Sequence, residues 1–176
     1  MDPLQPHTPR VEAAVLVPVY RRADGDLRLV LIRRSDVGAH GGHLALPGGK
    51  RDPSDGSLLV TALREAHEEM GIRRDQIDIL AELPPIETRT TNFRIYPFLA
   101  RLIQPVAWQP DEREVAEILD VSLAELSAAE VRLEDAPGEQ QAPYYRVGKN
   151  RLWGVTFRLL RPLVARLLAG EWAIKA

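Results

Sequence analysis

The segment Leu58–Met70 constrains the fold of this chain more than any other, because its apolar and acidic residues lie on separate sides of one predicted helix. The apolar side follows the i, i+3, i+4, i+7 and i+11 spacing of a stripe that faces a core. The residues of this stripe are Leu59, Ala62, Leu63, Ala66 and Met70. Ser54, Asp55 or Ser57 can cap the start of the helix, and Gly71 is suited to end it.

Other segments contain the short apolar runs that are typical of strands. The predicted strands are residues 13–20, 27–33, 77–83, 93–102 and 115–121. A short helix is predicted after Ser122, because Ser122 and Glu125 can form a capping box. A closing helix is predicted over Trp153–Leu168, with Pro162 at its start or at a kink.

Two segments are predicted as loops. Residues 38–50 contain five glycines and a proline, and residues 134–143 are polar and rich in proline and glycine. The 176 residues are enough for one domain, so we expect a flexible lead-in over 1–10 and a single domain over 11–176. The mixture of strands and helices predicts an α+β or α/β layered fold.

The charge and cysteine content exclude several function classes. Lysine and arginine number 23 against 25 aspartates and glutamates, with no long block of one charge, which argues against nucleic acid as a partner. The absence of cysteine excludes disulfides, thiolate zinc sites and cysteine nucleophiles, so any metal must bind oxygen or imidazole ligands. No signal peptide or membrane-spanning run is evident, and we therefore expect a cytoplasmic protein without a membrane partner.

Three carboxylates fall on the flank of the predicted helix that points away from its apolar stripe. Glu65, Glu68 and Glu69 stand at i, i+3 and i+4. Carboxylates this close repel one another, and a hard divalent cation such as Mg²⁺ relieves that repulsion. The alternative is an acidic face that is simply solvated. The segment Leu46-Pro47-Gly48-Gly49-Lys50, just upstream, favours the metal, because glycine lets the backbone approach a ligand closely.

These residues together resemble the Nudix box of diphosphate hydrolases, G-x5-E-x7-R-E-U-x-E-E-x-G-U. Residues 64–72 match its run R-E-U-x-E-E-x-G-U. The gap from Gly49 to Arg64 is one residue longer than the pattern, no glutamate occupies its middle position, and Ala66 is small for the aliphatic position. The resemblance implies an α+β fold of the Nudix type, an α/β/α sandwich with a mixed central sheet between helices.

The longer gap is similar to that of the coenzyme A pyrophosphatase branch of the family. Residues 47–66 resemble the sequence pattern of this branch, and residues 13–18, 114–121 and 153–156 do so as well. The resemblance therefore spans residues 11 to about 168. Ahead of the box the chain keeps the Arg34-Ser35 pair, His40 and Gly42 of the branch signature. Gly38 stands where the branch has arginine, and Leu46 replaces its phenylalanine.

The resemblance implies the following roles at the box. Glu65 and Glu69 would be the principal ligands of Mg²⁺ or Mn²⁺, and Glu68 a third ligand or the base that orients water. The carbonyl of Gly48 or Gly49 would complete the coordination. Arg64 is expected to pair with Glu68 and fix its rotamer, although a plain surface ion pair is the alternative.

Further roles are less closely tied to the box. Glu114 and Glu117 are the candidate general bases, each with a solvated strand-edge charge as its alternative. Phosphate groups are expected to bind a subset of the nearby cations, namely Arg33, Arg34, Lys50, Arg51, Arg89 and Arg94. His40 and His43 can contact substrate or metal, or can simply hydrogen-bond within their loop. Trp153 is expected in the core rather than as a platform for a base.

The favoured function is metal-dependent hydrolysis of coenzyme A or its thioesters to 3′,5′-ADP and 4′-phosphopantetheine or its acyl form. The partner would be this small nucleotide, and the protein a monomer or homodimer. Gly38 keeps a second substrate class open, ADP-ribose or another nucleoside diphosphate-X. A non-catalytic Nudix-fold binding module is a third hypothesis, which the presence of all three glutamates disfavours.

Overall fold

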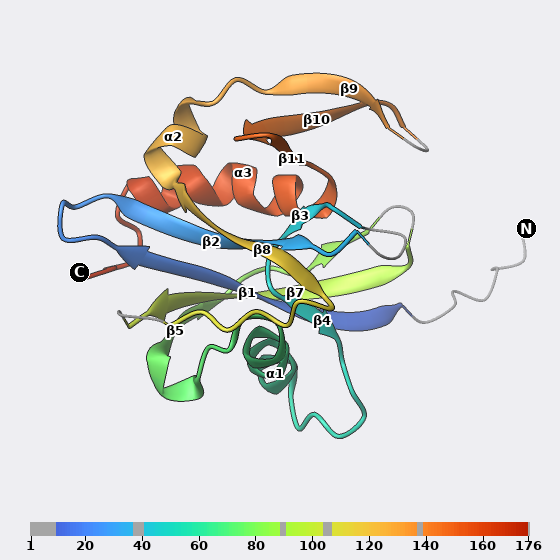
Figure 1. The fold of residues 1–176 in the computed structure, drawn as a ribbon, viewed down its shortest axis with the longest axis vertical. Coiled ribbons are helices and arrows are strands. Elements are labelled where there is room, and N and C mark those ends of the chain that lie inside the picture. The colour runs from blue at the N-terminus through green and yellow to red at the C-terminus, as the bar shows by residue number, and fades with distance from the viewer. Residues whose placement is uncertain (1–9, 37–40, 89–90, 104–106, 137–138, 176) are drawn as a thin grey trace, which may run out of the picture.

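The computed structural model describes residues 10–36, 41–88, 91–103, 107–136 and 139–175. A mixed sheet of eight strands lies between helix α1 on one face and helices α2 and α3 on the other (Figure 1). The strands of this sheet are β1 (Val11–Arg21), β2 (Leu27–Arg34), β3 (Leu44–Ala45), β4 (Gly48–Lys50), β5 (Ile77–Glu82), β6 (Ile86–Glu87), β7 (Phe93–Leu102) and β8 (Val115–Ser122). The helices are α1 (Leu58–Met70), α2 (Leu123–Ala128) and α3 (Gly154–Leu168), with a 3₁₀ turn at Arg74–Gln76. The architecture is α+β, as predicted.

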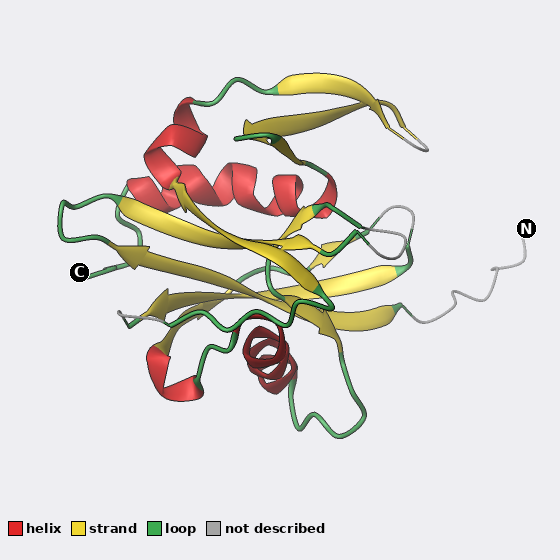
Figure 2. Cartoon of the chain, in the orientation of Figure 1, coloured by secondary structure: helices red, strands yellow, loops and turns green. Residues whose placement is uncertain are grey.

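The central strands run in the order β3-β2-β1-β7-β5, with β4 paired to β1, β6 to β7 and β8 to β2. β1 and β7 are parallel from Val11↔Phe93 to Val19↔Arg101, and the other pairs are antiparallel. A second, antiparallel sheet in the order β11-β10-β9 lies beyond α3 (Figure 2). Its strands are β9 (Arg132–Ala136), β10 (Glu139–Val147) and β11 (Asn150–Leu152).

Strand β1 is buried on both faces, which explains why it reads as a continuous apolar run. Ala14 and Leu16 belong to the core cluster under α1. Val17 and Val19 belong to the cluster under α3. Successive side chains of a strand point to opposite faces, so a single strand supplies both cores.

Helix α1 has the predicted bounds. Ser57 is the cap that the structure uses, its hydroxyl oxygen accepting a hydrogen bond from the Val60 N–H at 3.2 Å. Gly71 ends the helix in the left-handed conformation at φ 72°. Ala62, Ala66 and Met70 of the apolar stripe are fully buried against the sheet, so the opposite flank is left to the acidic side chains.

Both loop predictions are wrong in part. Residues 38–50 include β3 and β4, and residues 134–143 belong largely to β9 and β10. β4 pairs through glycine backbone, and a Cβ on Gly48 would lie 2.3 Å from the Ala14 carbonyl oxygen. The segment looked like a loop because no apolar side chain marks this strand.

Three further expectations concern the position of Pro162, the N-terminal lead-in and membrane-spanning segments. Pro162 lies inside α3 rather than at its start. Of the predicted lead-in only Arg10 falls among the described residues. Within the described ranges, no helix is both long enough and apolar enough to span a membrane.

Candidate active site

The glycine bend, which we define as Pro47-Gly48-Gly49 at the entry to β4, packs directly on two of the three glutamates of the helix. The Gly48 N–H donates a hydrogen bond to Glu69 Oε2 at 2.8 Å. A Cβ on Gly49 would lie 2.4 Å from the Glu65 carboxyl carbon. The bend itself is held to the sheet, because the Leu16 N–H donates to the Pro47 carbonyl at 2.9 Å. Backbone and carboxylates therefore meet at one place, as the motif predicted.

The three glutamates differ in their surroundings. Glu69 is 2% exposed, and burial raises its pKa to about 8, although the Gly48 N–H and the Arg34 guanidinium act in the opposite direction. Burial also raises the pKa of Glu65, against the nearby Arg64. The Glu68 side chain is 56% exposed. Glu65 and Glu69 are thus the carboxylates held in a fixed, poorly hydrated position.

Arg64 is the centre of a hydrogen-bonded network on this flank. Its guanidinium bonds Glu65 Oε1 at 2.9 Å and Glu68 Oε2 at 3.0 Å, and it also donates to the Lys50 carbonyl at 3.2 Å. The predicted pair with Glu68 is therefore present. Two further bonds, both 3.0 Å, go to the two oxygens of Asp55. This fork-to-fork arrangement fixes the plane of the guanidinium.

Asp55 is the residue of this site that sequence reasoning missed, since it was considered only as a helix cap. It is buried and accepts hydrogen bonds from the Thr61 hydroxyl at 2.8 Å and the Asp52 N–H at 2.9 Å, besides Arg64. The Arg64 guanidinium is the main reason that its pKa lies below the usual range. The available signal was its place within residues 47–66, which resemble the coenzyme A branch.

Arginines neutralise the acidic flank in this structure, in addition to the two explanations weighed from the sequence, a divalent ion and solvation. Arg64 bonds Glu65 and Glu68, and Arg34 Nη1 lies 3.8 Å from Glu69 Oε1. In the part of the chain that the structure describes, no three acidic or imidazole side chains already converge on one metal position. The donors nevertheless fit Mg²⁺ or Mn²⁺, because carboxylate and backbone carbonyl oxygens are the hard ligands that these ions prefer.

Of the two candidate bases, Glu114 lies nearer the acidic flank. Its charge contributes to raising the pKa of both Glu65 and Glu69. It stands just before β8, where its carbonyl accepts a hydrogen bond from the Ser35 N–H at 2.8 Å. Glu117 instead lies 3.6 Å from Arg33.

The cations predicted to bind phosphate are dispersed. Arg34 alone, among those described, reaches a glutamate of the box. Arg33 pairs with Asp36 at 3.0 Å and Arg51 with Glu12 at 2.8 Å. Lys50 and Arg94 lie over the rings of Phe93 and Tyr96. Gly38, His40 and Arg89 lie outside the described residues.

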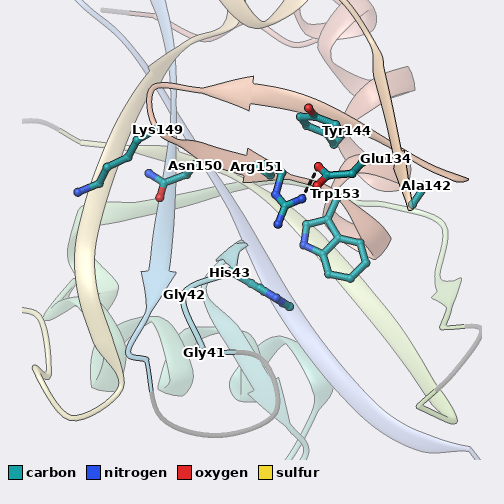
Figure 3. A pocket seen from close by; sticks show the side chains of 10 residues that line it. All are labelled: Gly41, Gly42, His43, Glu134, Ala142, Tyr144, Lys149, Asn150, Arg151 and Trp153. Atoms are coloured by element: carbon teal, nitrogen blue, oxygen red, sulfur yellow. Dashed lines mark ion pairs between the residues drawn. The ribbon is translucent and has the colours of Figure 1, made fainter. Parts of the chain in front are cut away.

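Trp153 is not a core residue, contrary to the prediction. It precedes α3 and lines an open cavity of about 350 Å³ between the second sheet and the segment 41–43 (Figure 3). The His43 ring meets the indole edge-on at a centroid distance of 5.0 Å. The indole is partly exposed. Its burial depends on which distant segments pack against it, and sequence periodicity does not contain that information.

Comparison with known proteins places these features in a family. The model described as the NUDIX domain matches residues 10–143. The uncharacterized Nudix hydrolase NudL of Cronobacter sakazakii is 32% identical over 161 residues, covering 89% of this chain and 82% of the relative. NudL of Pectobacterium atrosepticum is 31% identical over 169 residues, covering 93% and 86%.

Solved structures show the same fold. The Nudix hydrolase RenU of M. smegmatis has a TM-score of 0.67 at 19% identity, covering 95% of this chain and 91% of its own. The NUDIX domain of Shewanella oneidensis NrtR, described as a complex with ADP ribose, has a TM-score of 0.60 at 20% identity, covering 95% and 94%. The fold that the sequence resemblance implied is therefore confirmed.

Proposed function

The chain belongs to the Nudix family, and from this membership we propose that it hydrolyses the diphosphate of coenzyme A or its thioesters. Nudix hydrolases act on pyrophosphate bonds and generally need divalent metal ions. Water would add across the diphosphate: its oxygen bonds one phosphorus while the bond from that phosphorus to the bridging oxygen breaks. The products would be 3′,5′-ADP and 4′-phosphopantetheine or its acyl form.

The observation that carries this proposal is the contact between the Gly48-Gly49 bend and the carboxylates of Glu65 and Glu69. These two carboxylates, with a carbonyl of the bend and Glu68, are the residues that would hold Mg²⁺ or Mn²⁺. When bound, such an ion neutralises phosphate oxygens and lowers the pKa of a coordinated water.

The remaining residues position groups or accept protons. Asp55 fixes Arg64, and Arg64 in turn orients Glu65 and Glu68. Glu114 is proposed to accept the proton of the attacking water, because it lies close enough to Glu65 and Glu69 to repel them. Arg34, with its guanidinium beside Glu69, is the cation best placed to meet a phosphate oxygen.

The choice of coenzyme A is supported by the resemblance of residues 47–66 and 153–156 to that branch. A second candidate substrate is ADP-ribose, or another nucleoside diphosphate-X. It is favoured by Gly38, which replaces the arginine of the branch, and by the ADP ribose complex of the NrtR domain, which has the same fold.

A substrate panel separates these candidates. The protein is assayed with Mg²⁺ and with Mn²⁺ on coenzyme A, an acyl-coenzyme A, ADP-ribose, NADH and dinucleoside polyphosphates, and the nucleotide products are quantified by anion-exchange chromatography. We expect the highest kcat/KM with coenzyme A or its thioester. A higher value with ADP-ribose would overturn the branch assignment but leave the hydrolase assignment in place.

A further inference from the structure

The open cavity between the second sheet and the segment 41–43 has no role in the site described above. We propose that it binds the nucleoside end of the diphosphate substrate, with the base against Trp153 and an anionic group of the sugar against Lys149. This inference rests on the proposed function, which it extends by naming the part of the substrate that the cavity takes.

The size and lining of the cavity suit a nucleoside. Its volume of about 350 Å³ falls within the range of roughly 300–1,000 Å³ that is usual for small-molecule sites. Trp153 and Tyr144 provide aromatic surface, and on the side of the segment 41–43 the lining consists of Gly41, Gly42 and the His43 ring (Figure 3). Aromatic side chains bind every base by stacking on its π face. The polar side chains of the lining make an acyl chain a poor occupant.

Trp153 is held in place before any ligand arrives. The His43 ring packs edge-on against the indole, at an interplanar angle of 77°. The backbone of Trp153 also caps the start of α3, where its carbonyl accepts a hydrogen bond from the Phe157 N–H at 3.3 Å. A platform fixed on both counts loses little conformational entropy when a base binds.

The two cations of the cavity are not equivalent. Arg151 forms an ion pair with Glu134, and both residues line the cavity (Figure 3). The side chain of Lys149, on the turn between β10 and β11, forms no ion pair or hydrogen bond with any described residue. In Figure 3 this side chain extends away from Trp153, and because it is exposed and unpaired among the described residues it can turn toward an anionic group of the ligand, such as a phosphate on the ribose.

Arg34 connects this cavity to the acidic flank. Its backbone N–H donates to the His43 carbonyl at 3.0 Å, and its carbonyl accepts from the Gly42 N–H at 3.1 Å. Its guanidinium lies 3.8 Å from Glu69 Oε1. One residue thus contacts both the floor of the cavity and a proposed metal ligand, so a substrate with its diphosphate at the box can place its nucleoside in the cavity.

Binding is tested without catalysis. The nucleotide 3′,5′-ADP is titrated, in the absence of metal, into the wild type and into Trp153→Ala by calorimetry. Removal of the platform is expected to raise the Kd about tenfold or more. Trp172→Phe, in the segment that follows the C-terminal end of α3, is the control and should leave the Kd unchanged. An equal Kd in the wild type and Trp153→Ala would overturn the proposal.

Lys149 provides the second measurement, on an exposed turn where substitution does not threaten folding. Lys149→Ala is expected to raise the Kd for 3′,5′-ADP about threefold to tenfold, and to change the Kd for AMP much less if the 3′-phosphate is its partner. Lys175→Ala is the control. If Lys149→Ala leaves the Kd unchanged for both 3′,5′-ADP and AMP, this assignment of Lys149 is overturned.

Failure of the inference differs from failure of the proposed function. If coenzyme A is hydrolysed and Trp153→Ala changes neither the KM nor the Kd for 3′,5′-ADP, the cavity is not the nucleoside site. If 3′,5′-ADP binds through Trp153 but coenzyme A is not hydrolysed, the cavity assignment stands and the choice of substrate falls.

Discussion

The α1 side of the molecule and the second-sheet side are built on different principles. On the α1 side, Glu65, Glu69 and Asp55 are largely buried, and each is held by an arginine or a backbone N–H. On the second-sheet side, the cavity is open, and the Arg151–Glu134 pair that lines it is about half exposed. The first region is suited to fix the positions of charges for chemistry, and the second to bind and release a ligand.

The largest effect is expected from Glu69→Gln. This change preserves size and keeps an oxygen for the Gly48 N–H, but it removes the buried carboxyl group that we assign to metal binding. We expect kcat to fall by about a thousandfold, with the melting temperature little changed or raised. Glu171→Gln, in an exposed pair with Arg166, is the matched control. Activity within twofold of wild type in Glu69→Gln would remove the distinction between the two regions.

Glycine substitutions in the bend are expected to have the next largest effects. In Gly49→Ala the added Cβ meets the Glu65 carboxylate, the mobile end of a side chain, so kcat should fall about a hundredfold with a small loss of stability. In Gly48→Ala the added Cβ meets backbone of β1 instead, so unfolding should be the main consequence. The measurements are kcat and thermal melting.

Gly56→Ala is the control for both changes, because a Cβ at Gly56 meets nothing within 4 Å. It should retain the activity and stability of the wild type. If Gly49→Ala behaved like Gly56→Ala, the bend would not restrain Glu65.

Asp55→Asn tests the network around Arg64. The pKa of Asp55 is lowered mainly by its hydrogen bonds with Arg64, so its charge stabilises the fold above the unfolded pKa of about 3.9. That contribution is lost as the pH falls below this value. We expect a melting temperature several degrees below wild type at pH 7, with a difference that begins to shrink below about pH 4 and keeps shrinking toward about pH 2. Melting curves across this range provide the test, and a constant difference would argue against the ionic contribution.

The smallest effect is expected from Arg151→Ala on the second-sheet side. It breaks an exposed ion pair with Glu134, which is worth about 0–1 kcal/mol of unfolding free energy. Denaturant unfolding of this variant and of Arg64→Ala compares the two regions directly, and we expect the larger loss in Arg64→Ala. Equal losses would mean that the network on α1 is no more than a surface feature.

The sequence predicts the α1 side better than the second-sheet side for physical reasons. The bounds of α1 and β7 follow from apolar periodicity and from the stop at Gly71, which are local properties. β9 and β10 form a peripheral sheet with polar residues, so no apolar alternation marks them. Their pairing depends on contacts between distant segments.

Some features of the individual site residues were predictable from the sequence and others were not. The neighbourhood of Glu65, Glu69 and the glycine bend was predicted because the motif compresses it into a short stretch. The burial of Asp55 and the partial exposure of Trp153 were not predicted. Both depend on what the rest of the chain places against them, which spacing along the sequence does not contain.

The central claim is that the bend and the acidic flank of α1 together hold a divalent cation. Mn²⁺ binding to the wild type, Glu69→Gln and Glu171→Gln, followed by electron paramagnetic resonance, tests it most directly. We predict saturable binding to the wild type and to Glu171→Gln, and a Kd at least about tenfold higher for Glu69→Gln. The same Kd for all three proteins would contradict the claim.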